Sequence, residues 1–182
     1  FNESDILGSS LNTPYFYVIS ENKDLTFKPT IFDSGIQMWQ NEYRQQNKNS
    51  SFVSDFALTK NYTNADDNKK NSIGHFFSKF KLNFDLDKFN TSELNINIQK
   101  VTKDTYLKVF DDVLLESPVK PSDKNIMSSS VSLSLDHEKF NLSSGLNLYE
   151  NLQTSKNSDR YQYVFPYYNL SFSSISNSYG SI

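Results

Sequence analysis

Alternation of apolar and polar side chains with a period of two is the feature of this chain that most constrains its fold. In FFSKFKLNFDL, residues 76–86, the Phe and Leu side chains at 76, 80, 82, 84 and 86 share one face, and the opposite face carries Lys79, Lys81, Asn83 and Asp85. Successive side chains point to opposite faces of a β-strand, whereas a helix repeats its faces every three or four residues. The alternation recurs in ELNINIQK (93–100), where Asn95 and Asn97 are polar, in SVSLSL (130–135) and in FNLSSGLNL (140–148).

These runs, and the turn residues between them, predict about nine strands. The expected ranges are 11–19, 23–32, 35–45, 49–62, 73–87, 90–101, 126–136, 139–151 and 160–175. Most connections are short, so consecutive strands are expected to pair as antiparallel hairpins. Longer connections are expected at 63–72 and 102–125, and the second contains a stretch compatible with one helical turn before Pro118 and Pro121. The predicted fold class is all-β, an antiparallel meander.

Composition excludes several classes of protein. Aromatic residues make up 15% of the chain although only 36% of it is hydrophobic, and disordered chains are poor in aromatics, so the chain is expected to fold. The net charge is −3 and the pI is about 5.4, so there is no broad basic field for nucleic acid. With no cysteine, disulfides and thiolate metal sites are excluded.

The expected strands are long for a soluble sheet. Soluble strands usually have ~5 to 6 residues, whereas a tilted strand needs ~9 to 11 residues to cross a bilayer. Length therefore favours part of a large transmembrane β-barrel, an incomplete barrel in which Phe and Leu face lipid and polar residues face an aqueous lumen. A soluble or surface-displayed β-sandwich that binds glycans or proteins, and an ordinary porin-like barrel, are the alternatives.

Aromatic residues near the expected strand ends have two interpretations. They suit interfacial girdles of a barrel, and ordinary core or cross-strand packing explains them equally well. The residues concerned are Tyr15, Tyr17, Trp39, Tyr43, Tyr62, Tyr161 and Tyr163.

No constellation for catalysis or metal binding is evident. His75 and His137 each lack a partner histidine at ligand spacing, and the acidic pairs at 66–67 and 111–112 lie in expected connections, where solvated carboxylates are the default. Calcium binding at these acidic pairs stays an open alternative that no other feature of the sequence supports. The chain has no GxSxG elbow and no glycine-rich phosphate loop. We expect no enzyme activity, no catalytic residues, no metal and no cofactor.

Prolines interrupt the first two expected strands. Pro14 lies in 11–19 and Pro29 lies in 23–32, and a proline cannot donate a hydrogen bond to a sheet ladder. Prolines in sheets are therefore confined to edges, first positions and bulges. Each would weaken the pairing of its strand.

The stretch TPYFYVISENKDLTFKPTIFDSGIQMWQNEYR, residues 13–44, resembles the opening barrel strands of the LPS-assembly protein LptD family, also called organic solvent tolerance proteins. The features shared are the Pro-Tyr-aromatic start, the Asn-x-Asp turn, the Leu-Thr-x-x-Pro strand and a closing Glu42, Tyr43 and Arg44. VTKDTYLKVFDD is similar to the family's Asp-x-x-Tyr-Leu motif at Asp104, Tyr106 and Leu107, although the residues match at different spacing. RYQYVFPYYNLSF is similar to a strand motif of the family at Tyr161, Gln162 and Pro166.

The resemblance implies a function in lipopolysaccharide (LPS) transport. Residues 1–182 would be a fragment of a single β-barrel domain in the outer membrane of a Gram-negative bacterium, part of the translocon that inserts LPS into the outer leaflet. The implied partners are LPS, an LptE-like plug lipoprotein, outer-membrane lipids, and periplasmic LPS bridge proteins that act through a jelly-roll domain absent from this sequence.

The resemblance also assigns roles to residues. Strands 11–32 would lie at the lateral gate, where Pro14 and Pro29 leave the seam between first and last strands poorly hydrogen-bonded. The alternative is that both prolines mark bulges or edges of a sheet that never opens. Residues expected to face the lumen are Lys79, Lys81, Asn83, Asp85, Asn95 and Asn97.

Overall fold

The computed structural model describes residues 2–4, 7–63, 70–155, 159–172, 176–177 and 180–181. Its strands are β1 (Asn2–Ser4), β2 (Gly8–Asn12), β3 (Tyr15–Ser20), β4 (Lys23–Phe32), β5 (Gln37–Gln46), β6 (Ser50–Thr63), β7 (Lys70–Asn83), β8 (Phe89–Val101), β9 (Ile126–His137), β10 (Phe140–Asn151), β11 (Tyr161–Phe172), β12 (Ser176–Asn177) and β13 (Gly180–Ser181). The helices are α1 (Tyr106–Phe110) and the 3₁₀ turn η1 (Asp111–Val113), which together confirm the predicted helical turn. Among the described residues, no helix is long and apolar enough to cross a membrane.

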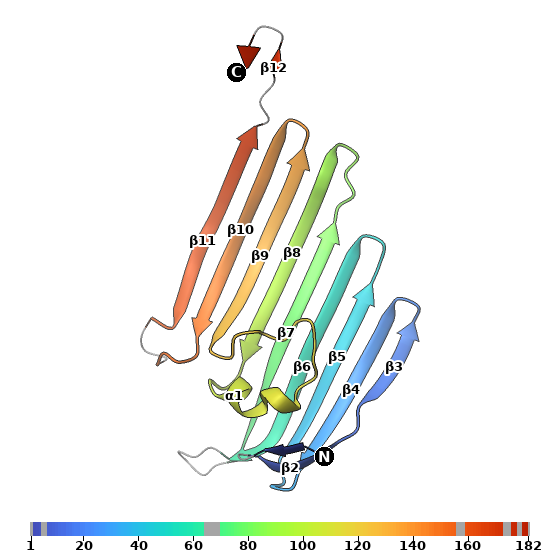
Figure 1. Cartoon of the computed structure of the whole chain (residues 1–182), viewed down its shortest axis with the longest axis vertical. Helices are drawn as coiled ribbons and strands as arrows, with labels where there is room; N and C mark the ends of the chain where they lie inside the picture. The colour runs from blue at the N-terminus through green and yellow to red at the C-terminus, as the bar shows by residue number, and fades with distance from the viewer. Residues whose placement is uncertain are drawn as a thin grey trace.

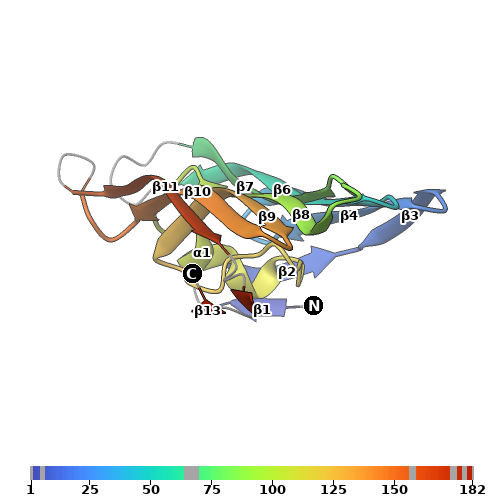
Figure 2. The same cartoon turned by 90° about the horizontal axis from the view of Figure 1, so that it is seen from above.

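The main sheet is an antiparallel meander in which each strand from β4 to β11 pairs with the next (Figure 1). This confirms the predicted all-β meander. Seen from above, the strands form one twisted layer, and the segment that contains α1 lies on one side of it (Figure 2). A second stacked sheet, which a β-sandwich requires, is not present among the described strands.

Several boundaries differ from the sequence prediction, and two of the differences affect residues singled out above. The range 11–19 was expected to be one strand, but the chain breaks at Thr13 and Pro14 into β2 and β3. Both strands pair with β4, at different places along it. The range 73–87 was expected to be one strand, but β7 ends at Asn83.

The sheet has one predominantly apolar face. Directly opposite residues of neighbouring strands share a face, so the register defines rows that cross the sheet. One row from β6 to β10 consists of Phe52, Phe80, Ile96, Val131 and Leu146. Val131 remains 41% exposed and Leu146 39% exposed. Large apolar side chains on this face therefore meet the surroundings of the protein.

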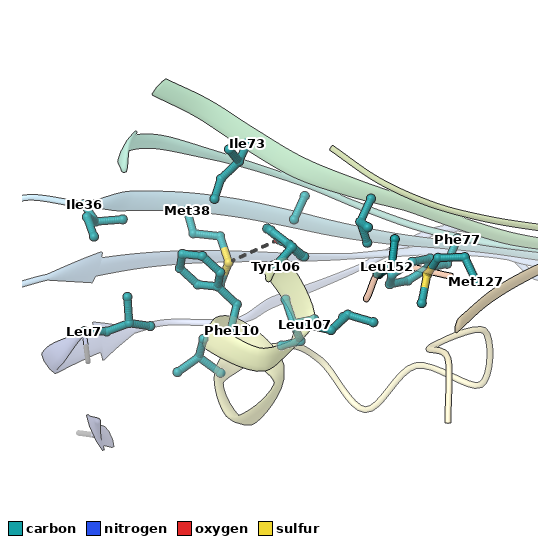
Figure 3. Packing of buried hydrophobic residues seen from close by; sticks show 14 of the residues in the cluster. Leu7, Ile36, Met38, Ile73, Phe77, Tyr106, Leu107, Phe110, Met127 and Leu152 are labelled. Atoms are coloured by element: carbon teal, nitrogen blue, oxygen red, sulfur yellow. Dashed lines mark hydrogen bonds between the residues drawn. The ribbon is translucent and has the colours of Figure 1, made fainter. Parts of the chain in front are cut away.

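The opposite face is polar and partly covered. The connection 102–125, called the cap below, folds back over it. A row on this face runs from β4 to β7 through Lys28, Gln40, Ala57 and His75. Figure 3 shows Tyr106 and Phe110 of α1 pointing towards Met38 and Ile73 of the sheet. The buried core lies between cap and sheet, because cap side chains cover apolar groups that the sheet alone would leave open.

Candidate functional site

The break between β2 and β3 brings the prolines together. The backbone N–H of Thr13 donates to the carbonyl oxygen of Pro29 at 3.3 Å. β4 pairs with β2 through residues 30–32 and with β3 through residues 23–27, so Pro29 lies between these two pairings. The nitrogen and the carbonyl of one strand residue face the same neighbour. The nitrogen of Pro29, which carries no hydrogen, thus faces the break between β2 and β3. The hydrogen bonds between β4 and β5, where Trp39 lies opposite Pro29, are not affected.

β3 is weakly held. All six of its residues are exposed, and the strand pairs only with β4. The pairing also shifts register between Val18 and Ser20. A strand without buried side chains contributes little packing energy, so hydrogen bonds to β4 provide most of its attachment. This is the arrangement expected at an edge that separates from its sheet.

Most of the side chains predicted to line the lumen share the polar face. Lys79 lies opposite Asn97, Lys81 opposite Asn95, and Asn83 opposite Glu93. The ammonium group of Lys79 donates to the carbonyl of Pro118 in the cap at 3.3 Å, and Lys81 pairs with Glu93 at 2.8 Å. The register therefore unites β7 and β8 into one polar surface beside the cap.

Asp85 is not part of this surface. It lies in the connection after β7 with a positive φ of 54°, and its backbone N–H donates to Oδ1 of Asn83 at 2.9 Å. The alternation was extended past the strand end because Phe84, Asp85 and Leu86 continue the pattern in sequence only. The predicted extension of the strand to residue 85 is wrong, and the lumen-facing role of Asp85 stays a prediction.

Buried polar side chains bond the cap to the sheet. Gln40 donates to both carboxylate oxygens of Asp55, at 2.9 and 3.0 Å, and its own Oε1 accepts the backbone N–H of Leu115 at 2.9 Å. Lys28 donates to the carbonyl of Val113 at 2.7 Å. Gln40 and Asp55 are fully buried, and unpaired buried polar groups are costly, so these bonds specify where the cap lies.

His75 and Tyr106 extend the contact between cap and sheet. The Tyr106 hydroxyl lies 3.1 Å from Nδ1 of His75, and Nε2 of His75 lies 3.2 Å from Oδ1 of Asp55 without hydrogen-bond geometry. Burial raises the pKa of Tyr106, so the phenol keeps its proton. Asp55, His75 and Tyr106 contact one another in a row, as the residues of a catalytic relay do. Tyr106 is completely buried, however, so its hydroxyl is not accessible to a substrate in this structure.

A set of charges secures the start of the cap. Arg160 forms two bonds to the carboxylate of Asp104, at 2.6 and 2.8 Å, and one to Glu150 at 2.8 Å. Lys100 pairs with the other oxygen of Glu150 at 2.6 Å. The fork of an Arg side chain matches a carboxylate in two-bond geometry, so this group links the start of the cap to β8 and β10.

Asp111 forms a second charged group, which lies entirely within the cap and joins its helical part to its C-terminal end. Lys124 lies 2.7 Å and Lys120 3.0 Å from its carboxylate. Burial opposes ionisation, but the hydrogen bonds from Lys124 and Lys120 outweigh it and hold the pKa of Asp111 below its usual value. No group of three or more His, Asp or Glu residues suited to a metal is present among the residues that the structure describes.

A hollow of about 410 Å³ lies on the polar face beside the cap. Its polar lining consists of Ser51, Lys79, Lys81, Asn95 and Asn97, and its apolar lining includes Val53, Pro118 and Val119. No carboxylate lines it. The alternation predicts these lysines and asparagines on one polar face, but nothing in it indicates that the cap completes a hollow with them.

Sequence reasoning missed the anchors of the cap. Gln40, Asp55 and His75 occupy inward positions of alternating strands, which is a detectable signal, but the pattern alone does not distinguish water from a covering segment. Tyr62, considered for an aromatic girdle, packs against Phe110 of the cap with ring centroids 5.7 Å apart. Comparison with known proteins adds no identity: no protein-family model matches the chain, and no curated protein matches it.

Proposed function

We propose that this chain contributes wall and lateral-gate strands to an outer-membrane translocon that inserts LPS into the outer leaflet. The observation that carries the proposal is the difference in polarity between the two faces of the sheet. Apolar side chains form exposed rows on one face, while polar side chains and the cap occupy the other. Exposed apolar rows of this extent suit lipid, and a polar opposite face suits a water-filled interior.

Strand length supports the same function. β6 and β7 each contain 14 residues, β8 contains 13, and β9, β10 and β11 contain 12. A tilted strand crosses a bilayer with ~9 to 11 residues, so each of these is long enough. The described sheet is open, with β1, β2 and β3 at one margin and β11 at the other, as expected of a part of a larger barrel.

The gate would lie at β3. Pro14 and Pro29 remove donors at one place, and β3 buries no side chain. A net hydrogen bond contributes ~0.5 to 1.5 kcal/mol, so a few missing bonds make a short seam easier to open. The partners proposed on the basis of the sequence resemblance are LPS as cargo, an LptE-like plug lipoprotein inside the barrel, periplasmic LPS bridge proteins and outer-membrane lipids.

Proline replacement in the full-length protein tests this proposal. Pro14→Ala with Pro29→Val restores two backbone donors, and we expect slower delivery of LPS to the cell surface, by up to about tenfold if the restored bonds hold the seam closed. Pro166→Ala is the matched control, because Pro166 lies in β11, away from the break. Delivery at the wild-type rate in the double variant, with normal protein levels in the outer membrane, would refute the gate role.

A further inference from the structure

We propose that the hollow beside the cap binds the anionic group of an amphiphile, with a phosphate or carboxylate at the lysines and an apolar part against the cap. The inference rests on the proposed function, because it names the part of the cargo that the polar face of the barrel wall would contact. Its evidence is the chemistry of the lining.

Charge selects an anion. Lys79 and Lys81 lie two positions apart on β7, so both project from the same face into the hollow. Asn95 and Asn97 face them from β8, where the amide of Asn97 already donates to the carbonyl of Ser128 at 2.8 Å and Asn95 adds an amide group able to donate hydrogen bonds. Lys81 is paired with Glu93, which lies outside the lining, whereas no ion pair with a carboxylate is described for Lys79, so the hollow has a net positive lining in a protein whose net charge is negative.

Existing contacts leave both lysines available. The Lys81 ammonium pairs with Glu93, but its side chain is 53% exposed, and exposed pairs of this kind contribute little to stability. The Lys79 ammonium holds the carbonyl of Pro118 by a long bond of 3.3 Å. An anionic ligand would therefore exchange weak partners for a stronger, charge-assisted one.

Apolar lining distinguishes an amphiphile from a free anion. Val53 of β6 and Pro118 and Val119 of the cap border the hollow on the side towards the core. Inorganic phosphate would gain nothing from these groups, whereas an acyl or other apolar part would be removed from water there. A neighbouring hollow shares Ser51 and Lys81 and has both Lys48 and Glu93 in its lining, so the excess of positive charge is confined to the hollow beside the cap.

The test uses the full-length protein purified in detergent, with the double variant Lys79→Gln and Lys81→Gln. The probes are bisphosphorylated lipid A, its dephosphorylated form, and inorganic phosphate. We expect the wild type to bind the bisphosphorylated probe at least about tenfold more tightly than the variant does, since bonds to charged groups are the strong ones. The dephosphorylated probe should bind weakly to both proteins, and inorganic phosphate should not compete at millimolar concentration.

Lys88→Gln with Lys139→Gln is the matched control, because it removes the same charge from tight turns outside the hollow. Equal binding of the bisphosphorylated probe by the hollow variant and this control would overturn the inference. Competition by inorganic phosphate would overturn the amphiphile and leave an anion site. If the proline variants deliver LPS normally while the lysine variants lose binding, the gate proposal fails and the binding site remains.

Discussion

Gln40 and Asp55, on neighbouring strands, form a two-bond contact that also reaches the cap, because the same amide accepts the backbone N–H of Leu115. One side chain thus joins β5, β6 and the connection after β8. The polar face of the sheet and its covering segment are specified together by buried polar groups, and the apolar contacts of Figure 3 fill the space between them.

Replacing Gln40 tests whether this contact fixes the cap. In Gln40→Ala, the Asp55 carboxylate loses its buried donors and Leu115 loses its acceptor, which should cost about 1 to 3 kcal/mol for each group left unsatisfied. We expect faster amide hydrogen exchange across 102–125. Gln46→Ala, at an exposed position of the same strand, should leave this exchange unchanged. Equal protection of the cap in both variants would contradict the anchor role.

Asp111 predicts a dependence of cap stability on acidity. Its pKa in the folded protein lies below the ordinary value of 3.8, so the stabilisation from Lys120 and Lys124 is present above pH 3.8 and is lost as the pH falls through the lower folded value. Proteolysis of the cap by an acid-active protease should therefore accelerate below pH 3.8. Asp111→Asn should already be accelerated at neutral pH and change less on acidification. Asp112→Asn, at the exposed neighbour, should behave like wild type.

Adjacent residues of one strand should differ in their accessibility to water when the protein lies in the membrane. The chain contains no cysteine, so single cysteines report cleanly. Asn95→Cys and Ser132→Cys lie opposite each other on the polar face, and Ile96→Cys and Val131→Cys form the neighbouring pair on the apolar face. In outer-membrane fractions of the full-length protein, a water-soluble maleimide should modify the first pair several-fold faster than the second. Equal modification of the two pairs would exclude a lipid-facing surface.

Residues 1–182 produced alone should aggregate. The isolated piece exposes two strand edges, at β3 and β11, together with rows of apolar side chains. Unpaired edges and large apolar patches both promote association between chains. We expect high-molecular-weight species in size-exclusion chromatography without detergent. A monomer with a sharp, reversible unfolding transition would contradict this expectation.

The extent to which the fold follows from sequence differs between elements. Strands in 76–86 and 93–100 could be predicted from local residues, because only a β-strand places alternate side chains on opposite faces. β7 and β8 lie where this alternation predicts them. The break at Pro14 was missed, because extended residues on both sides look like one strand until β4 is seen to pair with each part separately.

The position of the cap could not be predicted for a different reason. The sequence of 102–125 indicated a helical turn, but which surface it covers depends on its contacts with Lys28, Gln40 and His75. The two partners in each of these contacts are between 31 and 85 residues apart along the chain. Such contacts are long-range, and a polar residue at an inward strand position predicts contact with water as readily as with a buried amide. The hollow beside the cap was hidden from the sequence for the same reason.

The side-chain bonds that hold the cap also make some strands of the sheet harder to separate than others. Lys28, Gln40 and His75 connect the cap directly to β4, β5 and β7. Asp55 of β6 joins this group through Gln40 and His75, and none of the bonds described above joins the cap to β3. The cap therefore links these four strands to one another through side-chain bonds, in addition to their backbone pairing. β3, beside the two prolines, is held only by its hydrogen bonds to β4. A lateral pull on this wall would be absorbed first at β3, with the four linked strands keeping their register.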